Sequence, residues 1–164
     1  MKKFFTKKNN SGFTLVEVLI ASSIIVVSVL AVMSAAVKGI ELSNRALKQT
    51  QANFILEEGA EAVRIIRDNN WENISTLSVD TNYYLSYDIN TNTWSLGTTP
   101  VNQIDSIFDR TIIISSVNRD VNKDISESGD LDSGIKKVTI NVSWNSNGEN
   151  INKSLVFYLS DIFS

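Results

Sequence analysis

Residues 12–37 read GFTLVEVLIASSIIVVSVLAVMSAAV, and this stretch governs the interpretation of the rest of the chain. Between Phe13 and Val37 the single charged residue is Glu17. A helix needs about 20 predominantly apolar residues to cross roughly 30 Å of hydrocarbon, because it rises 1.5 Å per residue. The stretch therefore predicts a membrane-spanning helix that carries one acid near its beginning.

The charges on the two sides of this segment differ in sign. Lys2, Lys3, Lys7 and Lys8 crowd the first eight residues, although the whole chain has 15 Lys and Arg against 18 Asp and Glu, a net charge of −3. Lysines keep their end of a membrane helix in the cytoplasm, so the body of the chain is expected outside. Because that body is acidic, no direct nucleic-acid binding is expected.

The composition argues against catalysis. The chain has no Cys and no His, which excludes disulfides, thiol nucleophiles, imidazole bases and Cys/His zinc sites. No phosphate-binding loop and no recognisable pair of catalytic carboxylates is present. We therefore expect a protein that is not an enzyme and has no organic cofactor.

Beyond Val37 the helical pattern continues without a breaker, but it becomes amphipathic. Charged and amide residues fill most faces, and Asn69 and Asn70 predict the end of the helix. Apolar or small residues recur at helical spacing, and we expect them to form one stripe: Ile40, Leu47, Phe54, Ile55, Gly59, Ala62 and Ile66.

Residues 70–164 predict an antiparallel β-rich domain. Strands are expected at residues 83–89 and 93–96, at 110–117, and in a hairpin over 135–160 whose turn is Asn145–Gly148. The apolar face of this hairpin, which includes Trp144, needs a cover, and the stripe of helix 40–68 is expected to supply it. The predicted fold class is α+β, with a long N-terminal helix packed on a C-terminal antiparallel sheet.

Residues 12–20, GFTLVEVLI, resemble the N-terminal motif of the type IV filament superfamily, which comprises type IV pilins, minor pilins and the pseudopilins of type II secretion. The strong resemblance covers about residues 1–40. It implies a prepilin leader peptide over residues 1–12, a membrane and filament-core half of the helix over 13–37, an amphipathic half over 38–69 and a globular domain over 70–164.

The resemblance also implies roles for three residues. A prepilin peptidase would cut between Gly12 and Phe13 and methylate the new amine of Phe13. An acid inside a membrane helix is unfavourable by roughly 2.5–3.5 kcal/mol at the helix centre, less near an end, so Glu17 needs a partner. The resemblance favours the Phe13 amine of a neighbouring subunit, and the amine of the same helix or the lipid headgroups are the alternatives.

The implied partners are other pilin subunits, the prepilin peptidase, a membrane platform protein and a cytoplasmic assembly ATPase. The chain would be a single-pass cytoplasmic membrane protein before assembly, with its C-terminal domain outside, and then part of an extracellular or periplasmic filament. GFTLVEVLIA and VTINVSW are closest to minor pilins, and a minor pseudopilin of a type II secretion system is the near alternative.

Two functions from other classes stay open. One is a filament-tip module for binding or adhesion. Another is a secreted β-domain cleaved near Ser34–Ala36, although Glu17 would be an odd member of an ordinary signal peptide.

The segment 119–134 is rich in acids, and some members of the superfamily bind calcium through acidic loops near the C-terminus. Oxygen ligands suit calcium, but the spacing matches no calcium-binding motif, so a solvated loop is the primary prediction and calcium the alternative. The candidate ligands are Asp120, Asp124, Glu127, Asp130 and Asp132.

Overall fold

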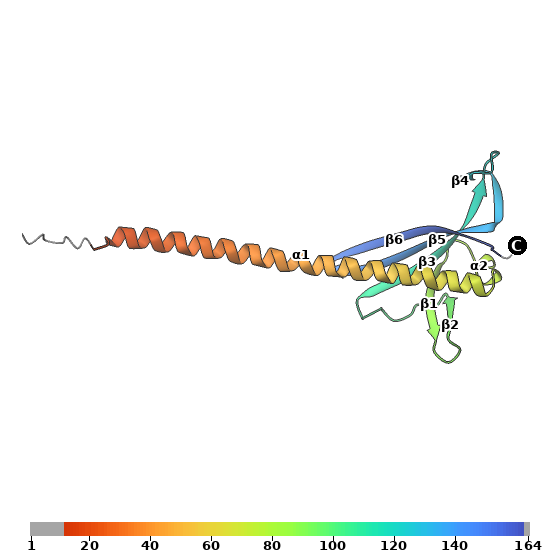
Figure 1. Cartoon of the computed structure of the whole chain (residues 1–164), viewed down its shortest axis with the longest axis horizontal. Coiled ribbons are helices and arrows are strands. Elements are labelled where there is room, and N and C mark those ends of the chain that lie inside the picture. Colours follow the sequence, from red (N-terminus) through yellow and green to blue (C-terminus); the bar gives the residue numbers. More distant parts are fainter. Residues whose placement is uncertain (1–11, 163–164) are drawn as a thin grey trace, which may run out of the picture. The chain divides into compact units, whose positions relative to one another are not determined.

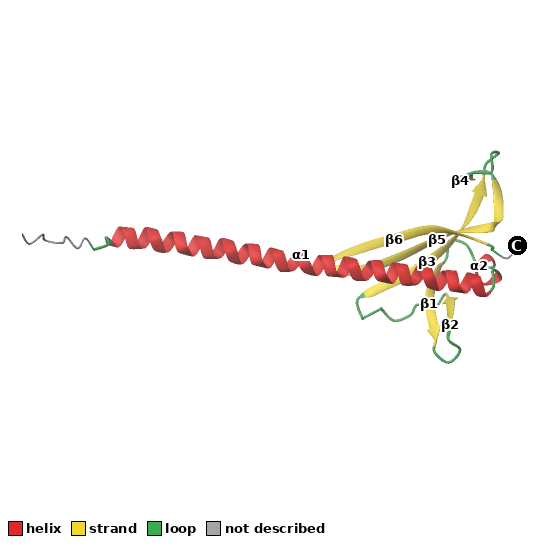
Figure 2. Ribbon diagram, in the orientation of Figure 1, coloured by secondary structure: helices red, strands yellow, loops and turns green. Residues whose placement is uncertain are grey.

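The computed structural model describes residues 12–162, so the leader residues 1–11 lie outside the described part of the chain. Figures 1 and 2 show its elements. They are α1 (Leu15–Asn69), α2 (Glu72–Ser75), β1 (Asn82–Asp88), β2 (Thr93–Gly97), β3 (Phe108–Arg119), β4 (Ile125–Ser126), β5 (Asp130–Ser146) and β6 (Glu149–Ser160). The chain divides into two compact units, Met1–Asn44 and Arg45–Ser164, and α1 contributes residues to both.

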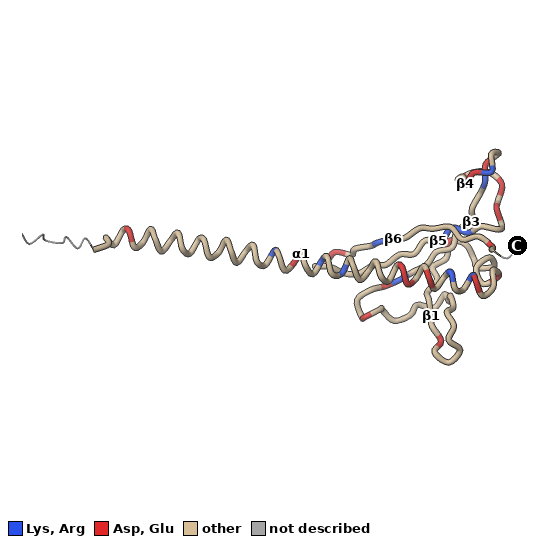
Figure 3. Tube along the Cα trace, viewed as in Figure 1, with Lys and Arg blue, Asp and Glu red and all other residues tan. Residues whose placement is uncertain are grey.

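Within the first unit, α1 is apolar on all sides from Leu15 to Val37 apart from Glu17, the one charged residue of that range. Figure 3 shows this single acidic position near the beginning of the helix. An 18-residue window of this helix reaches a mean hydropathy of 2.7, and none of that window is buried within the chain. By length and composition, α1 is the one described helix that can cross a membrane.

The serines of this half do not break the helix. Each hydroxyl donates to a backbone carbonyl three or four residues earlier, at 2.8–3.0 Å, as seen at Ser22, Ser23, Ser28 and Ser34. A hydroxyl bonded in this way needs no partner from lipid or water.

The second unit contains the sheet. Its strand order is β2-β1-β3-β5-β6, with β4 paired to β3, and all neighbouring strands are antiparallel. The predicted terminal hairpin is confirmed, since β5 and β6 pair from Ile135–Ser160 to Ser146–Glu149. Asn147 (φ 54°) and Gly148 (φ 86°) form its two-residue turn, which needs positive φ at both positions. Together with α1 this confirms the predicted α+β class.

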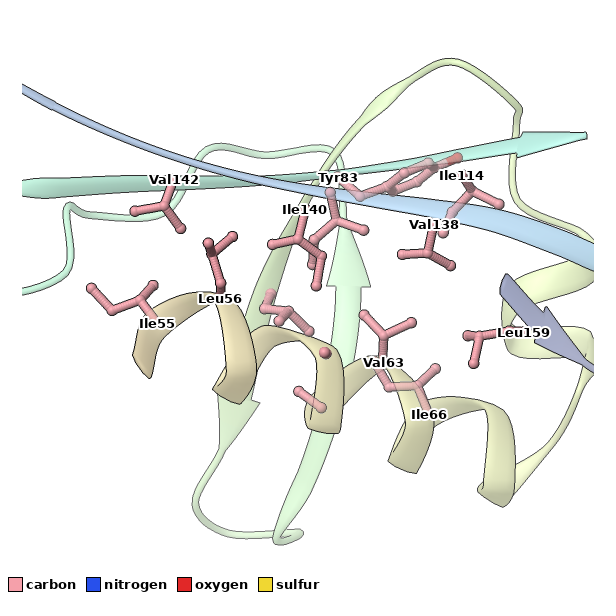
Figure 4. Packing of buried hydrophobic residues seen from close by; sticks show 14 of the residues in the cluster. Ile55, Leu56, Val63, Ile66, Tyr83, Ile114, Val138, Ile140, Val142 and Leu159 are labelled. Carbon is pink, nitrogen blue, oxygen red and sulfur yellow. The ribbon is translucent and has the colours of Figure 1, made fainter. Parts of the chain in front are cut away.

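The core of the second unit lies between α1 and the inner face of the sheet. Figure 4 shows Ile55, Leu56, Val63 and Ile66 of the helix directed toward strand residues such as Ile140. Trp144 is buried as predicted, and its ring meets Phe108 edge-on with the centroids 5.6 Å apart. Burial of this apolar surface is the main stabilising contribution to the unit.

The helix and the sheet approach each other closely at Gly59. A Cβ at this position would lie 3.2 Å from Cδ of Arg110 and 3.3 Å from Cδ1 of Ile140. The Arg110 side chain is only 8% exposed; its Nη1 donates to the Ile55 carbonyl at 3.1 Å and lies 3.5 Å from Oε2 of Glu58. Burial lowers the pKa of the Arg110 guanidinium, and the charge of Glu58 opposes this shift. The hydrogen bond to Ile55 and the ion pair with Glu58 connect β3 to α1.

One sequence prediction about the helix is wrong. Leu47 and Phe54 do not cover the sheet, because their side chains are 58% and 65% exposed. Consecutive helical residues are about 100° apart around the axis, so Phe54 and Ile55 belong to different faces. The apolar residues of 40–66 therefore form two stripes, and only the stripe that contains Ile55 and Gly59 faces the sheet.

Most residues of 119–134 are exposed, as predicted for a solvated loop, but part of the segment is strand rather than loop. Residues Ile125–Ser126 form β4, and β5 already begins at Asp130. The register of the β3–β5 pair shifts between Ser116 and Val117, and the pairing then continues to Arg119 and Asp130. Such a bulge bends a strand without ending it, which alternation of apolar residues cannot reveal.

We predict that Gly59→Val lowers the free energy of unfolding by about 1–3 kcal/mol, because the added atoms overlap Arg110 and Ile140. Gly39→Val is the matched control in the same helix, since a Cβ there meets nothing within 4 Å. Chemical unfolding of the detergent-solubilised chain, followed by tryptophan fluorescence, measures both. Equal stability of the two variants would contradict the close approach.

Candidate processing and assembly site

The helix begins two residues after the predicted cleavage position. Gly12, Phe13 and Thr14 are not helical, and Leu15 is the first helical residue. The Thr14 carbonyl accepts the first helical hydrogen bond, from the Val18 N–H at 3.2 Å. Thr14 is therefore the N-cap residue, and the Gly12–Phe13 peptide bond lies outside the helix.

Thr14 and Glu17 satisfy each other's polar groups. The Thr14 N–H donates to Oε2 of Glu17 at 2.8 Å, and the Thr14 hydroxyl donates to the same oxygen at 3.0 Å. In return the Glu17 N–H donates to the Thr14 hydroxyl oxygen at 3.3 Å. This reciprocal pattern is a capping box, which satisfies two donors that the first turn of a helix otherwise leaves free.

The structure thus places the three residues of the predicted site within one short segment. Phe13 is 88% exposed, and Gly12 is so open that a Cβ there would meet nothing within 4 Å. Glu17 has a partner inside its own chain, Thr14, which the sequence reasoning missed. The spacing Thr14-Leu15-Val16-Glu17 is the T-x-x-E signature of a capping box and contained the signal. Pairing of Glu17 with a Phe13 amine stays a prediction.

A second feature lies on the part of α1 within the second unit. Leu47, Phe54 and Ile65 are 58%, 65% and 45% exposed, and we call them the outer stripe. At 3.6 residues per turn they fall within about 20° of one line along the helix. Phe54 lies about 140° around the helix from Gly59, so the outer stripe faces away from the sheet. Exposed apolar residues aligned along a helix are typical of a contact with another helix.

The acidic segment 119–134 is organised by its own hydrogen bonds. Oδ1 of Asp120 accepts the N–H groups of Asn122 (2.8 Å) and Asp124 (3.0 Å). Asp132 pairs with Arg119 across the β3–β5 ladder. Within residues 12–162 no three acidic side chains come together as metal ligands would, so a calcium site at the five candidate acids stays a prediction without support from the geometry.

Two donors hold Asp132 in its ionised form. The hydrogen bond from Arg119, followed by the bond from the Gly134 N–H, lowers the pKa of the Asp132 carboxyl below its usual value. A carboxyl whose pKa is lower in the folded state stabilises that state above the unfolded pKa, about 3.9, and loses this contribution as the pH falls through the folded pKa.

We therefore predict that Asp132→Asn is less stable than the wild type near pH 7 and that the difference shrinks progressively as the pH falls below about 4 and through the folded pKa. Urea unfolding of the detergent-solubilised chain over a pH series measures this difference. Asp130→Asn is the control, because it removes the same charge two residues away without removing the bond to Arg119. A gap between wild type and Asp132→Asn that does not change with pH would contradict the assignment.

Comparison with known proteins supports the predicted processing and assembly segment that contains Gly12, Phe13 and Glu17. Residues 7–37 match the family model of the prokaryotic N-terminal methylation motif, a match that includes Gly12, Phe13 and Glu17. No curated protein and no solved structure shows a significant match to the chain. The motif is the hallmark of the prepilin-type signal and indicates a structural subunit rather than an enzyme. Together with the apolar part of α1, it fits a membrane-anchored protein.

Proposed function

Because the chain carries the prepilin-type methylation motif of type IV pilins and pseudopilins, we propose that it is a minor pilin of a type IV pilus-like filament. The observation that carries the proposal is the combination of this motif with a helix half that is apolar on every side and uncovered within the chain. Such a surface is stable in lipid or among other helices, and not in water.

Processing is the first step of the proposed function. A prepilin peptidase hydrolyses the Gly12–Phe13 amide, so that one water supplies OH to the Gly12 carbonyl carbon and H to the Phe13 nitrogen. The peptidase then transfers a methyl group from a sulfonium methyl donor to the Phe13 amine; the N–CH3 bond forms as the S–CH3 bond breaks, the donor leaves as a thioether and the amine loses a proton. The non-helical backbone and the open surroundings of Gly12 support access of an enzyme to this bond.

Assembly is the second step. The apolar half of α1 leaves the bilayer and packs among the corresponding helices of other pilin subunits, driven by a cytoplasmic ATPase through a membrane platform protein. The amine of Phe13 in one subunit then pairs with Glu17 of a neighbour, which fixes the axial register. The outer stripe supplies a further apolar contact surface, in the second unit.

The near alternative is a minor pseudopilin of a type II secretion system, which uses the same signal and the same helix. Deletion of the gene separates the two roles. Loss of surface filaments supports the minor pilin, and loss of secretion of a folded exoprotein supports the pseudopilin. A deletion that changes neither would count against both.

We predict that the mature chain begins at N-methylated Phe13 and that Gly12→Val reduces the amount of this species by at least about tenfold, because a branched side chain next to the scissile bond obstructs the peptidase. Mass spectrometry of a membrane fraction from cells with their own prepilin peptidase measures the N-terminus.

The control for Gly12→Val is Gly39→Val. A Cβ at either glycine meets nothing within 4 Å, so neither change strains the folded chain. The Gly39 variant is expected to be cut normally. A wild-type chain that begins near Val37, or one that is never cut, would overturn the proposed function.

We predict that Phe54→Glu leaves folding unchanged within about 0.5 kcal/mol, because the side chain is exposed, but lowers filament yield at least about tenfold. The reason is that a carboxylate in an apolar helix contact loses its hydration. Quantification of sheared filaments and thermal unfolding of the purified chain measure the two effects.

Asn53→Glu is the matched control, since it adds the same charge at the adjacent exposed position, about 100° from the outer stripe. Wild-type filament yield for Phe54→Glu would exclude the outer stripe from the subunit contact.

A further inference from the structure

The start of α1 lies two residues after the proposed end of the leader, and a specific set of hydrogen bonds fixes it there. The Thr14 carbonyl accepts the first helical bond, and the side chains of Thr14 and Glu17 cap the backbone N–H groups at this end. The two residues N-terminal to Thr14, Phe13 and Gly12, have no helical conformation. The helix therefore begins two residues after the bond that the peptidase is proposed to cut.

The position of the N-terminal end of α1 matters because other residues that can cap a helix precede Thr14 in the sequence. The nearest residue of N-cap type before Thr14 is Ser11, and Asn9 and Asn10 precede it. A helix capped at Ser11 would place Gly12 and Phe13 in its first turn, with their backbone wound rather than extended. Enzymes that cut peptide bonds bind the chain in an extended form, so that its backbone groups are free to pair with the enzyme.

We propose that Thr14 is a positioning residue for leader removal: as the N-cap of α1, together with Glu17, it stops the helix short of the Gly12–Phe13 bond and keeps that bond in a non-helical, cleavable backbone. This inference rests on the proposed processing at Gly12–Phe13. Thr14 itself takes no part in the hydrolysis. Its role is to raise the fraction of chains in which the bond is accessible, and the cutting rate scales with that fraction.

The capping box survives the reaction that it prepares. Hydrolysis changes only the Gly12 carbonyl and the Phe13 nitrogen, whereas all three bonds of the box lie within residues 14–17. The product helix therefore begins at the same residue as the precursor helix. Phe13 remains outside it, and its new amine is free for methylation.

The test uses the full-length precursor, purified in detergent, with a purified prepilin peptidase. The rate of leader removal is followed by mass spectrometry for wild type, Thr14→Val, Thr14→Ser and Thr14→Asn. Valine has the shape of threonine but cannot cap, whereas serine and asparagine differ in shape and cap well. Loss of an N-cap typically costs about 1 kcal/mol, which shifts the equilibrium between the two helix starts about fivefold, so Thr14→Val is expected to be cut more slowly by up to about fivefold, and Ser and Asn at the wild-type rate.

Glu17→Gln separates capping from assembly. A glutamine oxygen can still accept the Thr14 N–H, so this variant is expected to be cut at the wild-type rate. It has no charge to pair with an amine, and it is expected to fail in filament assembly.

Two results would overturn the inference. Thr14→Val cut as fast as wild type would show that the cap does not control access. Equal slowing of the Val, Ser and Asn variants would show that the peptidase recognises the threonine side chain directly. A wild-type precursor that is not cut at Gly12–Phe13 would instead overturn the proposed function. In that case the Cα chemical shifts of Phe13 and Thr14 still report whether Thr14→Val moves the helix start toward Ser11, and an unmoved start would overturn the capping role.

Discussion

The packing of α1 residues Ala52–Ile66 on the sheet is the contact on which the second unit depends. Small residues on this face, Ala52, Gly59 and Ala62, let the strands approach closely, and the buried Arg110 bonds a carbonyl of the helix. A helix can turn only one face toward the sheet at a time. Because this face packs on the sheet, the outer stripe points away from the sheet. The same helix therefore stabilises the fold with one face and exposes apolar side chains on another.

Periodicity in the sequence predicts most of the architecture. A long run of uncharged residues identifies the membrane half of α1, and alternating apolar and polar residues identify the β5–β6 hairpin. Each pattern reflects whether a face of the element is exposed to lipid, to water or to the core. The sequence does not reveal which of two apolar stripes faces the sheet, since Phe54 and Ile55 are equally apolar. It also does not reveal the bulge at Ser116–Val117, or that Arg110 lies among buried residues, because both depend on neighbours distant in the chain.

In the candidate site, too, some features could be predicted from the sequence and others could not. Gly12, Phe13 and Glu17 follow from the motif, since their spacing is local. The bonding of Glu17 to Thr14 is local as well, but the expectation of a positive charge beside Glu17 does not predict an uncharged partner. An acid in the first turn of a helix also meets the positive end of the helix dipole. Glu17 therefore has a structural reason for its position in the single chain, in addition to any part in contacts between chains.

The serines in the membrane half of α1 have a mechanical consequence. Because Ser22, Ser23, Ser28 and Ser34 return their hydroxyls to their own backbone, this segment presents almost no free donor to a neighbouring helix. Contacts made by such a surface depend on area and shape rather than on direction. In the proposed filament, packing of these segments would resist lateral separation but oppose sliding and rotation only weakly, so the axial register would depend on the charged Phe13–Glu17 pair.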